Sequence, residues 1–200
     1  MRVCFYTLGC KVNLNETGAL EQMFRGAGFT IVPEGEEADV FVVNSCTVTN
    51  FGDQKSRKWL RRKKRENPGA VTVLTGCYPQ AFPREAAAVQ EADIITGARN
   101  RAALPQLVRA FSLDRQRIVS IPQHEKGEDF ESCSAADFGV RTRAFLKIQD
   151  GCDNWCSYCI IPAARGPVRS KPMPELQSEL LTLARNGYRE VALTGINLSN

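Results

Sequence analysis

The sequence lacks the features that would place it in a membrane or in a secreted class. No apolar run approaches the roughly 18–20 residues that a membrane-spanning helix needs. The first residues contain no basic segment followed by an apolar stretch and a small-residue cleavage site, which is the pattern of a secretory signal. No internal repeat is visible, and histidine occurs once, at His124. We therefore expect a chain that works in the cytoplasm without a membrane anchor.

The composition is that of an ordinary globular chain. Hydrophobic residues make up 43% of the 200 residues and charged residues 24%, which excludes a disordered tail or a low-complexity spacer. The formal net charge is +4 and the isoelectric point is about 8.7. This mild positive charge permits a polyanionic partner without requiring one.

Cysteine is the unusual residue type. The eight cysteines are Cys4, Cys10, Cys46, Cys77, Cys133, Cys152, Cys156 and Cys159. Their share of the chain is below that of a small disulfide scaffold. In a reducing compartment disulfides are rare, and cysteines at set spacings more often bind metal.

Strand and helix patterns alternate through the first hundred or so residues. We expect strands at 2–8, 39–44, 70–75 and 93–96, and helices at 14–26, 52–66, 84–90 and 101–111. The apolar runs DVFVVN and AVTVLT are typical of strands buried on both faces. The alternating order predicts an α/β fold, with a parallel sheet and helices on both of its faces.

A second unit is expected after a linker. Residues 113–140 are polar and show little periodicity, so we predict a linker or irregular extension there. A strand over 141–149, a cysteine-rich loop, a helix over 174–186 and a strand over 190–194 then open a further α/β domain. About 60 residues are far fewer than the about 250 of a full barrel, so the chain is expected to stop inside a partial barrel. The expected parts are 1–112, 113–140 and 141–200.

Three cysteines lie close together on the expected loop. Cys152, Cys156 and Cys159 have the spacing C-x3-C-x2-C, directly after a strand. Short spacers let three thiolates converge on one inorganic centre. A structural zinc ion takes four protein ligands and an ordinary iron–sulfur cluster takes four cysteines, so three ligands indicate an iron left open for chemistry. The alternative is a zinc site with a remote fourth ligand.

Three other cysteines are dispersed in the sequence but share a position in the expected fold. Cys10, Cys46 and Cys77 each come just past the carboxyl end of a strand. Parallel strands bring such ends together at the edge of the sheet where α/β proteins bind ligands. The sequence therefore predicts a second set of three converging thiols. The alternative is three unrelated buried thiols, since free cysteine is often buried.

The two sets of cysteines, with their flanks, resemble the radical S-adenosylmethionine (SAM) methylthiotransferase family. The resembling segments are TLGCKVNLNET (7–17), NSCTVTNFGDQKSR (44–57), TGCYPQ (75–80) and FLKIQDGCDNWCSYCIIPAARGPVRSKP (145–172). The flanks look most like the bacterial branch that acts on N6-threonylcarbamoyladenosine in tRNA. The branches acting on isopentenyl-adenosine in tRNA and on a ribosomal-protein aspartate share the cysteines but differ around Cys46.

The resemblance implies an enzyme that transfers a methylthio group to the modified adenine at position 37 of tRNA. It implies two [4Fe–4S] clusters, each held by one set of three cysteines. The cluster at Cys152, Cys156 and Cys159 would cleave SAM, and an auxiliary cluster at Cys10, Cys46 and Cys77 would carry the sulfur.

Further cofactor contacts and partners follow from the same resemblance. Tyr158, Thr194 and Gly195 are the implied SAM contacts. The implied partners are tRNA, a reductant of the flavodoxin or ferredoxin type, and a sulfur donor of unknown identity. A small RNA-binding domain is implied to follow the barrel.

A basic run follows Cys46. Eight of the eleven residues at 55–65 are Lys or Arg. Lys55, Arg57, Arg61 and Arg62 are candidate contacts for tRNA phosphates, and such contacts would make binding strongly dependent on salt. Lys55 and Arg57 match the family's Lys-Ser-Arg. A solvated helix face is an equally weighted alternative.

Residues near the cysteines are expected to support the sites. Arg165 and Arg169, in the family's Arg-Gly-x-x-Arg-Ser pattern, are expected either to meet SAM or tRNA or to stabilise their loop. Trp155 is expected to shield its cluster. Asn13, Asn44 and Glu16 are candidates to hydrogen-bond the auxiliary cluster or the substrate, and Asn15 is a candidate helix cap.

The remaining residues of interest have plainer expected roles. Trp59, Leu60 and Cys4 are expected in the core. Cys133 and the lone His124 have no expected role.

Two other classes of function compete with the enzyme. One is a zinc-binding RNA-interaction module that uses the thiols structurally and the basic run for binding. The other is an electron-transfer or sulfur-carrier protein with two ordinary clusters and no SAM chemistry. Metal content separates the first from the enzyme, and SAM cleavage separates the second.

Overall fold

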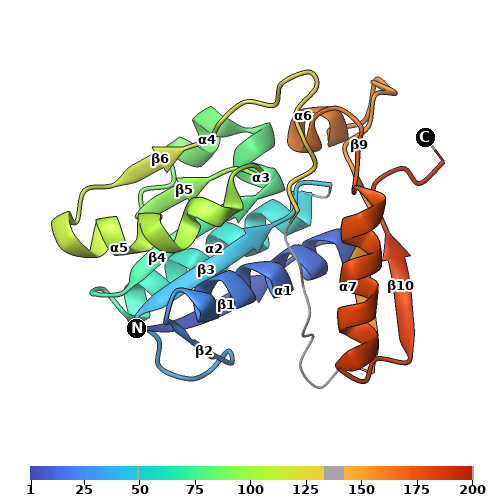
Figure 1. Ribbon diagram of the computed structural model, residues 1–200. Helices are drawn as coiled ribbons and strands as arrows, with labels where there is room; N and C mark the ends of the chain where they lie inside the picture. The colour runs from blue at the N-terminus through green and yellow to red at the C-terminus, as the bar shows by residue number, and fades with distance from the viewer. Residues whose placement is uncertain (49, 133–141, 200) are drawn as a thin grey trace.

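The computed structural model describes residues 1–48, 50–132 and 142–199, and these form two α/β units that lie side by side (Figure 1). The larger unit contains a six-stranded parallel sheet with the order β2-β1-β3-β4-β5-β6. Its strands are β1 (Arg2–Thr7), β2 (Thr30–Val32), β3 (Val40–Ser45), β4 (Val71–Gly76), β5 (Ile94–Thr96) and β6 (Ile118–Ser120). The α/β class expected from the sequence is confirmed.

Helices cover both faces of this sheet. They are α1 (Lys11–Gly26), α2 (Asn50–Glu66), α3 (Cys77–Ala81), α4 (Pro83–Ala87) and α5 (Leu104–Asp114), with a 3-10 turn η1 (Arg101–Ala103) before α5. Phe24 of α1 and Val108 of α5 pack on one face, whereas Leu60 of α2 packs on the other. Every residue of β3 and β4 is buried, as their continuous apolar sequences predict.

The residues expected in the core lie there. Trp59 is 5% exposed, and Leu60 and Cys4 are fully buried. The Trp59 ring stacks on Tyr6 at a centroid distance of 4.9 Å, and its Nε1 donates a hydrogen bond of 2.9 Å to Glu34. Trp59 and Leu60 therefore anchor α2 on the sheet, and basic residues such as Arg61 and Arg62 remain exposed on its outer side.

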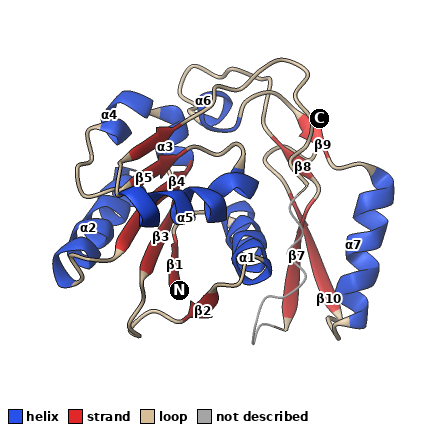
Figure 2. Cartoon of the chain, turned by 60° about the vertical axis from the view of Figure 1, so that its left-hand side comes forward, coloured by secondary structure: helices blue, strands red, loops and turns tan. Residues whose placement is uncertain are grey.

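The smaller unit is built on a parallel pair of strands. Its elements are β7 (Arg143–Lys147), β8 (Gln149–Asp150), α6 (Ile161–Arg165), β9 (Arg169–Ser170), α7 (Met173–Arg185) and β10 (Glu190–Thr194). β7 pairs in parallel with β10, and β8 pairs antiparallel with β9. Helix α7 packs along the β7–β10 pair, with Leu183 buried against Leu146 (Figure 2). This order matches the strand–loop–helix–strand pattern expected at the start of a second domain.

The structure differs from the expected elements in several places. The stretch 113–140 begins inside α5 and contains β6, so the irregular structure expected for Ile118–Ser120 is wrong. Three residues in an edge strand carry too little periodicity to be recognised. The short elements β2 and α3 were likewise not expected, and α4 is shorter than the helix expected at 84–90. The domain boundaries themselves stay predictions, and residues 133–140 lie outside the described part.

Membrane insertion has no support in the helices that the structure describes. Among residues 1–48, 50–132 and 142–199, none of the helices is both long enough and apolar enough to cross a membrane. The cytoplasmic location stays a prediction.

Gly76, at the end of β4, adopts a backbone conformation that favours glycine. Its φ is +98°, and a Cβ there would lie 2.5 Å from Asn44 Oδ1 and 2.6 Å from the Ser45 carbonyl oxygen. Gly76→Ala should therefore lower the free energy of unfolding by about 1–3 kcal/mol, measured by urea denaturation. Gly69→Ala is the matched control, because a Cβ there meets nothing within 4 Å. Equal stability of the two variants would contradict the strain assigned to Gly76.

Candidate functional site

The three dispersed thiols meet at one edge of the larger sheet. Cys10 precedes α1 after β1, Cys46 follows β3, and Cys77 begins α3 directly after β4. These three strands are neighbours, and their registers pair Thr7 with Asn44 and Ser45 with Gly76. The strand ends are thus level, and the loops that carry the thiols open on the same side of the sheet.

Asn13 is the side chain around which these loops are organised. Cys10 Sγ donates to Asn13 Oδ1 at 3.6 Å, and Cys77 Sγ lies 3.9 Å from the same oxygen. Asn13 Nδ2 donates to the carbonyl oxygens of Leu8 at 2.8 Å and Ser45 at 3.0 Å. One buried amide therefore connects the loops of all three cysteines. The candidate role given to Asn13 in hydrogen bonding at this site is consistent with its position.

Asn44 holds the amino-terminal turn of α1 from the other side. Its Nδ2 donates to the Asn13 carbonyl oxygen and to Thr17 Oγ1, both at 3.1 Å. Asn15, a candidate cap, does not cap α1, because its Nδ2 donates instead to the Phe145 carbonyl oxygen of the smaller unit at 2.6 Å.

The thiols differ in exposure. Cys10 is exposed, whereas Cys46 and Cys77 are buried. Burial raises the pKa of the Cys77 thiol to about 11, so without a bound metal this thiol is protonated at neutral pH. A Cβ at Gly9, whose φ is +116°, would lie 2.8 Å from Cys46 Cβ and 3.0 Å from Cys46 Sγ. Glycine is needed there because the loop of Cys10 passes directly against Cys46.

These residues fit an iron–sulfur cluster better than a single ion. Within the described ranges, no three His, Cys, Asp or Glu side chains are arranged to hold one metal ion. A cubane cluster distributes its cysteine ligands over separate iron atoms, so its thiols need not point at one centre. Iron binding would displace the thiol protons, and thiolates are the form that ligates metal. Three thiols at a ligand-binding sheet edge, close to one amide, are a suitable donor set.

The other cysteine loop follows β8 and is more open. Cys152 N–H donates to the Gly166 carbonyl oxygen at 3.0 Å, which closes the loop at its base. Cys159 N–H donates to the Cys156 carbonyl oxygen at 2.9 Å. Cys156 is exposed, and Cys152 and Cys159 are half-buried. All three thiols thus lie on one short loop, as their spacing predicts.

The aromatic residues of this loop face outward. Trp155 is 73% exposed and has a φ of +44°, and Tyr158 is 89% exposed. The shielding role expected for Trp155 and the SAM contact expected for Tyr158 stay predictions.

Gln149 ties this cysteine loop to the segment after β10. Its Nε2 donates to the carbonyl oxygens of Asp150 at 2.9 Å and Gly151 at 2.7 Å. Its Oε1 accepts from the N–H groups of Ile196 and Asn197, both at 2.8 Å. Gln149 therefore positions the turn that begins at the implied SAM-binding pair Thr194 and Gly195. Sequence reasoning gave Gln149 no role, although a polar residue after a buried strand was a visible signal.

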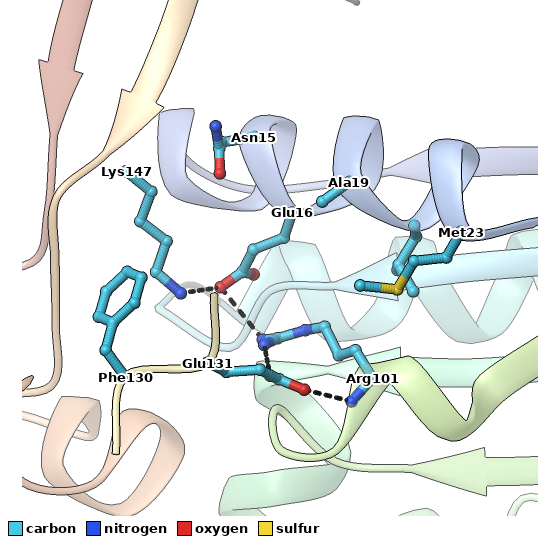
Figure 3. Close-up of a pocket in the computed structure, with 9 residues that line it drawn as sticks. Asn15, Glu16, Ala19, Met23, Arg101, Phe130, Glu131 and Lys147 are labelled. Atoms are coloured by element: carbon cyan, nitrogen blue, oxygen red, sulfur yellow. Dashed lines mark hydrogen bonds and ion pairs between the residues drawn. The ribbon is translucent and has the colours of Figure 1, made fainter. Parts of the chain in front are cut away.

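A buried ionic cluster joins the two units next to the site of Cys10, Cys46 and Cys77, which we call the first thiol site. Figure 3 shows three of its members, Glu16, Arg101 and Lys147. Glu16 of α1 is 3% exposed. Its carboxylate accepts hydrogen bonds from Lys147 of β7 at 2.7 Å and from Arg165 of α6, and it forms an ion pair with Arg101 of η1 at 3.1 Å. Lys147 also pairs with Asp150 at 2.5 Å. We call these five residues the junction cluster. Burial alone would raise the pKa of Glu16, but Arg101, Arg165 and Lys147 hold it well below its usual range.

The segment 124–131 also belongs to this junction. Glu131 pairs with Arg101 at 2.9 Å, and the Phe130 ring lies 5.4 Å from Lys147 Nζ. His124 Nδ1 lies 2.7 Å from Glu128, which also pairs with Arg169. Burial, with the nearby Arg169, lowers the pKa of His124 to about 4, so His124 is neutral at pH 7. The sequence gave His124 no role, but the structure places it in this network.

The two arginines of the Arg-Gly-x-x-Arg-Ser pattern are buried in the junction. The side chains of Arg165 and Arg169 are 1% and 9% exposed, and both pair with carboxylates. This arrangement corresponds to the loop-stabilising alternative. Direct contact of Arg165 with SAM or tRNA is not supported by a side chain that the protein itself encloses.

The basic run divides into groups with different surroundings. Arg57 lies over the ring of Tyr78, 5.5 Å from its centroid, beside Cys77. Arg61 pairs with Glu91 at 3.0 Å, and Arg62 pairs with Glu34 at 3.2 Å. Lys64 pairs with Asp93 at 2.7 Å. Arg57 therefore belongs to the thiol end of α2, whereas Arg61, Arg62 and Lys64 have acidic partners.

A groove runs along this side of α2. Its lining includes Tyr6, Lys55, Arg57, Lys58 and Arg65. The aromatic Tyr6 and the surrounding cations give it a positive surface that could accept phosphate groups.

Glu16→Gln should destabilise the protein and flatten its acid sensitivity. The folded-state pKa of Glu16 is depressed, so its ionisation stabilises the fold above the unfolded pKa of about 4.3, and this contribution is lost as the pH falls below that value. The variant should lose about 3–5 kcal/mol of unfolding free energy at pH 7. Urea denaturation from pH 7 to pH 3 measures both effects.

Glu36→Gln is the control for the Glu16 variant. Glu36 is 51% exposed in its side chain and pairs with Arg2 at 2.6 Å. Its replacement should cost no more than about 1 kcal/mol. A similar cost for both variants would contradict the importance assigned to the junction cluster.

Comparisons with known proteins agree with the resemblance. Residues 2–97 match the family described as "Uncharacterized protein family UPF0004". The chain is 44% identical over 195 residues to the threonylcarbamoyladenosine tRNA methylthiotransferase MtaB of Bacillus subtilis, which covers 98% of this chain and 43% of that protein. It is 37% identical to the protein of the same name from Aquifex aeolicus, covering 100% and 48%.

A second group of relatives is named for a different substrate. The chain is 31% identical to the tRNA-2-methylthio-N(6)-dimethylallyladenosine synthase of Clostridium novyi, over 97% of this chain and 44% of that protein. The chain spans less than half the length of these curated relatives. Over nearly its whole length the chain is similar to proteins named as tRNA methylthiotransferases and a tRNA methylthio synthase, and its residues 2–97 match the UPF0004 family.

Proposed function

We propose that this chain forms the cluster-holding part of a radical-SAM methylthiotransferase. The reaction converts N6-threonylcarbamoyladenosine at position 37 of tRNA to its 2-methylthio derivative. The observation that carries the proposal is the pair of three-thiol sites at the carboxyl ends of strands in two adjoining units. The names of the relatives that are 37–44% identical support the threonylcarbamoyl substrate. Activity on dimethylallyladenosine is the alternative within the same chemistry.

The chain's own residues have distinct tasks in this proposal. Cys152, Cys156 and Cys159 would hold the cluster to which SAM binds, and Cys10, Cys46 and Cys77 would hold the auxiliary cluster. When bound, the clusters and SAM supply radical generation and the transfer of sulfur and methyl groups.

Positioning of these groups is the work of the residues around the thiols. Asn13 fixes the loops of the first thiol site relative to one another. Gln149 fixes the second cysteine loop against the turn after Thr194 and Gly195. The mostly buried first site limits access of water to its thiols, whereas the open second loop leaves room for SAM.

The partners of the reaction are a tRNA, a reductant and a sulfur donor. Lys55 and Arg57 are the proposed phosphate contacts, since they lie at the thiol end of α2. Arg61 and Arg62 contribute less, because each already pairs with a carboxylate. The reductant is proposed to be of the flavodoxin or ferredoxin type, and the sulfur donor is unassigned.

A zinc-binding module is less well supported than the enzyme. Zinc in a structural site needs a fourth protein ligand. Nδ1 of His124, the one histidine, is already paired with Glu128 in the junction. This favours two clusters that each leave one iron open.

Metal content tests the proposal. The full-length protein, purified without oxygen, should bind about eight irons in two four-iron clusters. Replacing either set of three cysteines by Ala should leave about four irons. Loss of Cys152, Cys156 and Cys159 should abolish SAM cleavage, whereas loss of Cys10, Cys46 and Cys77 should preserve cleavage and abolish methylthio product. Product is measured by mass spectrometry of tRNA nucleosides.

Cys4→Ala is the control for the iron measurement. Cys4 is fully buried in β1 and belongs to neither set. This variant should retain about eight irons. Stoichiometric zinc in the parent protein, or normal product after loss of Cys10, Cys46 and Cys77, would refute the proposed function.

The basic helix is tested by its own pair of variants. Lys55→Glu with Arg57→Glu should weaken tRNA binding and reduce the salt slope by about one unit per lost phosphate contact. Arg61→Glu with Arg62→Glu is the matched control on the same helix, and it should change the slope much less. Binding of the full-length protein to tRNA is measured over a series of salt concentrations. A salt slope unchanged from the parent in Lys55→Glu with Arg57→Glu would show that Lys55 and Arg57 are only a solvated face.

A further inference from the structure

A guanidinium from the smaller unit is buried beneath the thiol site of the larger one. Arg165 ends α6, six residues after Cys159 in the sequence, and is 1% exposed. Its Nη1 pairs with Glu16, and its Nη2 donates to Asn13 Oδ1 at 2.5 Å. The loop that carries one set of thiols therefore sends a cation to the other set.

Arg165 and two of the thiols share one acceptor atom. Asn13 Oδ1 accepts from Arg165 and lies 3.6 Å from Cys10 Sγ and 3.9 Å from Cys77 Sγ. A thiol that binds iron loses its proton and can no longer donate to this oxygen. Arg165 then becomes the remaining side-chain donor to Asn13 Oδ1 among the described residues. The contact is thus suited to the metal-bound form of the site.

Arg165 has no carboxylate that pairs with it alone. Glu16 also pairs with Arg101 and Lys147. Asp150, 3.5 Å from Arg165, also pairs with Lys147. In addition, the Nε of Arg165 is buried and has no hydrogen-bond partner in the described part.

We propose that Arg165 is a positioning residue that sets the reduction potential of the cluster held by Cys10, Cys46 and Cys77. The inference rests on the proposed function, since it requires that cluster. One-electron reduction adds a negative charge to a cluster, and a fixed cation nearby stabilises the reduced form, most strongly in a buried site. Arg165 supplies this cation directly and also orients the Asn13 amide, whose Nδ2 is already fixed by Leu8 and Ser45.

The experiment isolates the auxiliary cluster in the full-length protein. The parent carries Cys152→Ala, Cys156→Ala and Cys159→Ala, so that its iron belongs to the first thiol site. Arg165→Met and Arg165→Lys are compared with the parent by iron content and by a redox titration followed by electron paramagnetic resonance. Lys147→Met is the matched control, because Lys147 is also a buried cation paired with Glu16 and has no contact with Asn13.

The expected result is a change in potential with the cluster still bound. Arg165→Met should shift the midpoint to a more negative value and alter the resonance spectrum, because the reduced form has lost its neighbouring cation. Arg165→Lys should restore most of the midpoint, and Lys147→Met should shift it less than Arg165→Met. If Arg165→Met binds iron poorly, the double variant Glu16→Gln with Arg165→Met, which removes the unbalanced carboxylate as well, is titrated in its place.

Several outcomes would overturn the inference. A midpoint and spectrum in Arg165→Met that match the parent, or in the double variant that match Glu16→Gln alone, would show that the cation does not act on the cluster. Equal shifts in the Arg165→Met and Lys147→Met variants would reduce Arg165 to one member of a general charge network. An equal loss of iron in Arg165→Met, Arg165→Lys and Lys147→Met would assign Arg165 to folding alone. A parent that binds no iron would instead refute the proposed function.

Discussion

The ionised Glu16 and its three buried cations are the interaction on which the arrangement of the two units depends. Moving charges out of water is costly, and the cost is offset only when every partner is in place. Arg101 comes from the sheet unit, whereas Lys147 and Arg165 come from the smaller unit, 131 and 149 residues away from Glu16. Separation of the units would remove Lys147 and Arg165 from Glu16, so that these charges lose their partners. The junction therefore fixes α1, and with it Cys10 and Asn13, against α6.

The parallel sheet brings together three thiols that are remote from one another in the sequence. Neighbouring parallel strands end at one edge, so the residues that follow β1, β3 and β4 meet without any long-range pairing of their own. Gly9 and Gly76 permit the close approach, because a Cβ at either position would overlap a neighbouring loop. Asn13 then links the loops by hydrogen bonds rather than by a covalent bond. The thiols stay free, which a metal site requires.

The parts of the fold that the sequence predicts are those with a strong local signal. The apolar runs of β3 and β4 and the three thiols that follow strands are visible in any reading of the chain. The short strand β6 was missed, because three residues carry no usable period and its partner β5 supplies the pairing. The junction cluster was missed for a different reason. A charged residue such as Lys147 at the end of a strand signals that a partner exists, but the identity of that partner depends on tertiary structure.

Helix α6 and Arg165 connect the two thiol sites. Five residues, four of them in α6, separate Cys159 from Arg165. Arg165 is fixed at its far end by Asn13 and Glu16. Arg165 therefore links the second cysteine loop to the amide that organises the first site. A reaction that needs both sites at once requires such a fixed spacing, because a small displacement of reacting groups can cost a large factor in rate. The buried guanidinium supplies this spacing and a local charge in one side chain.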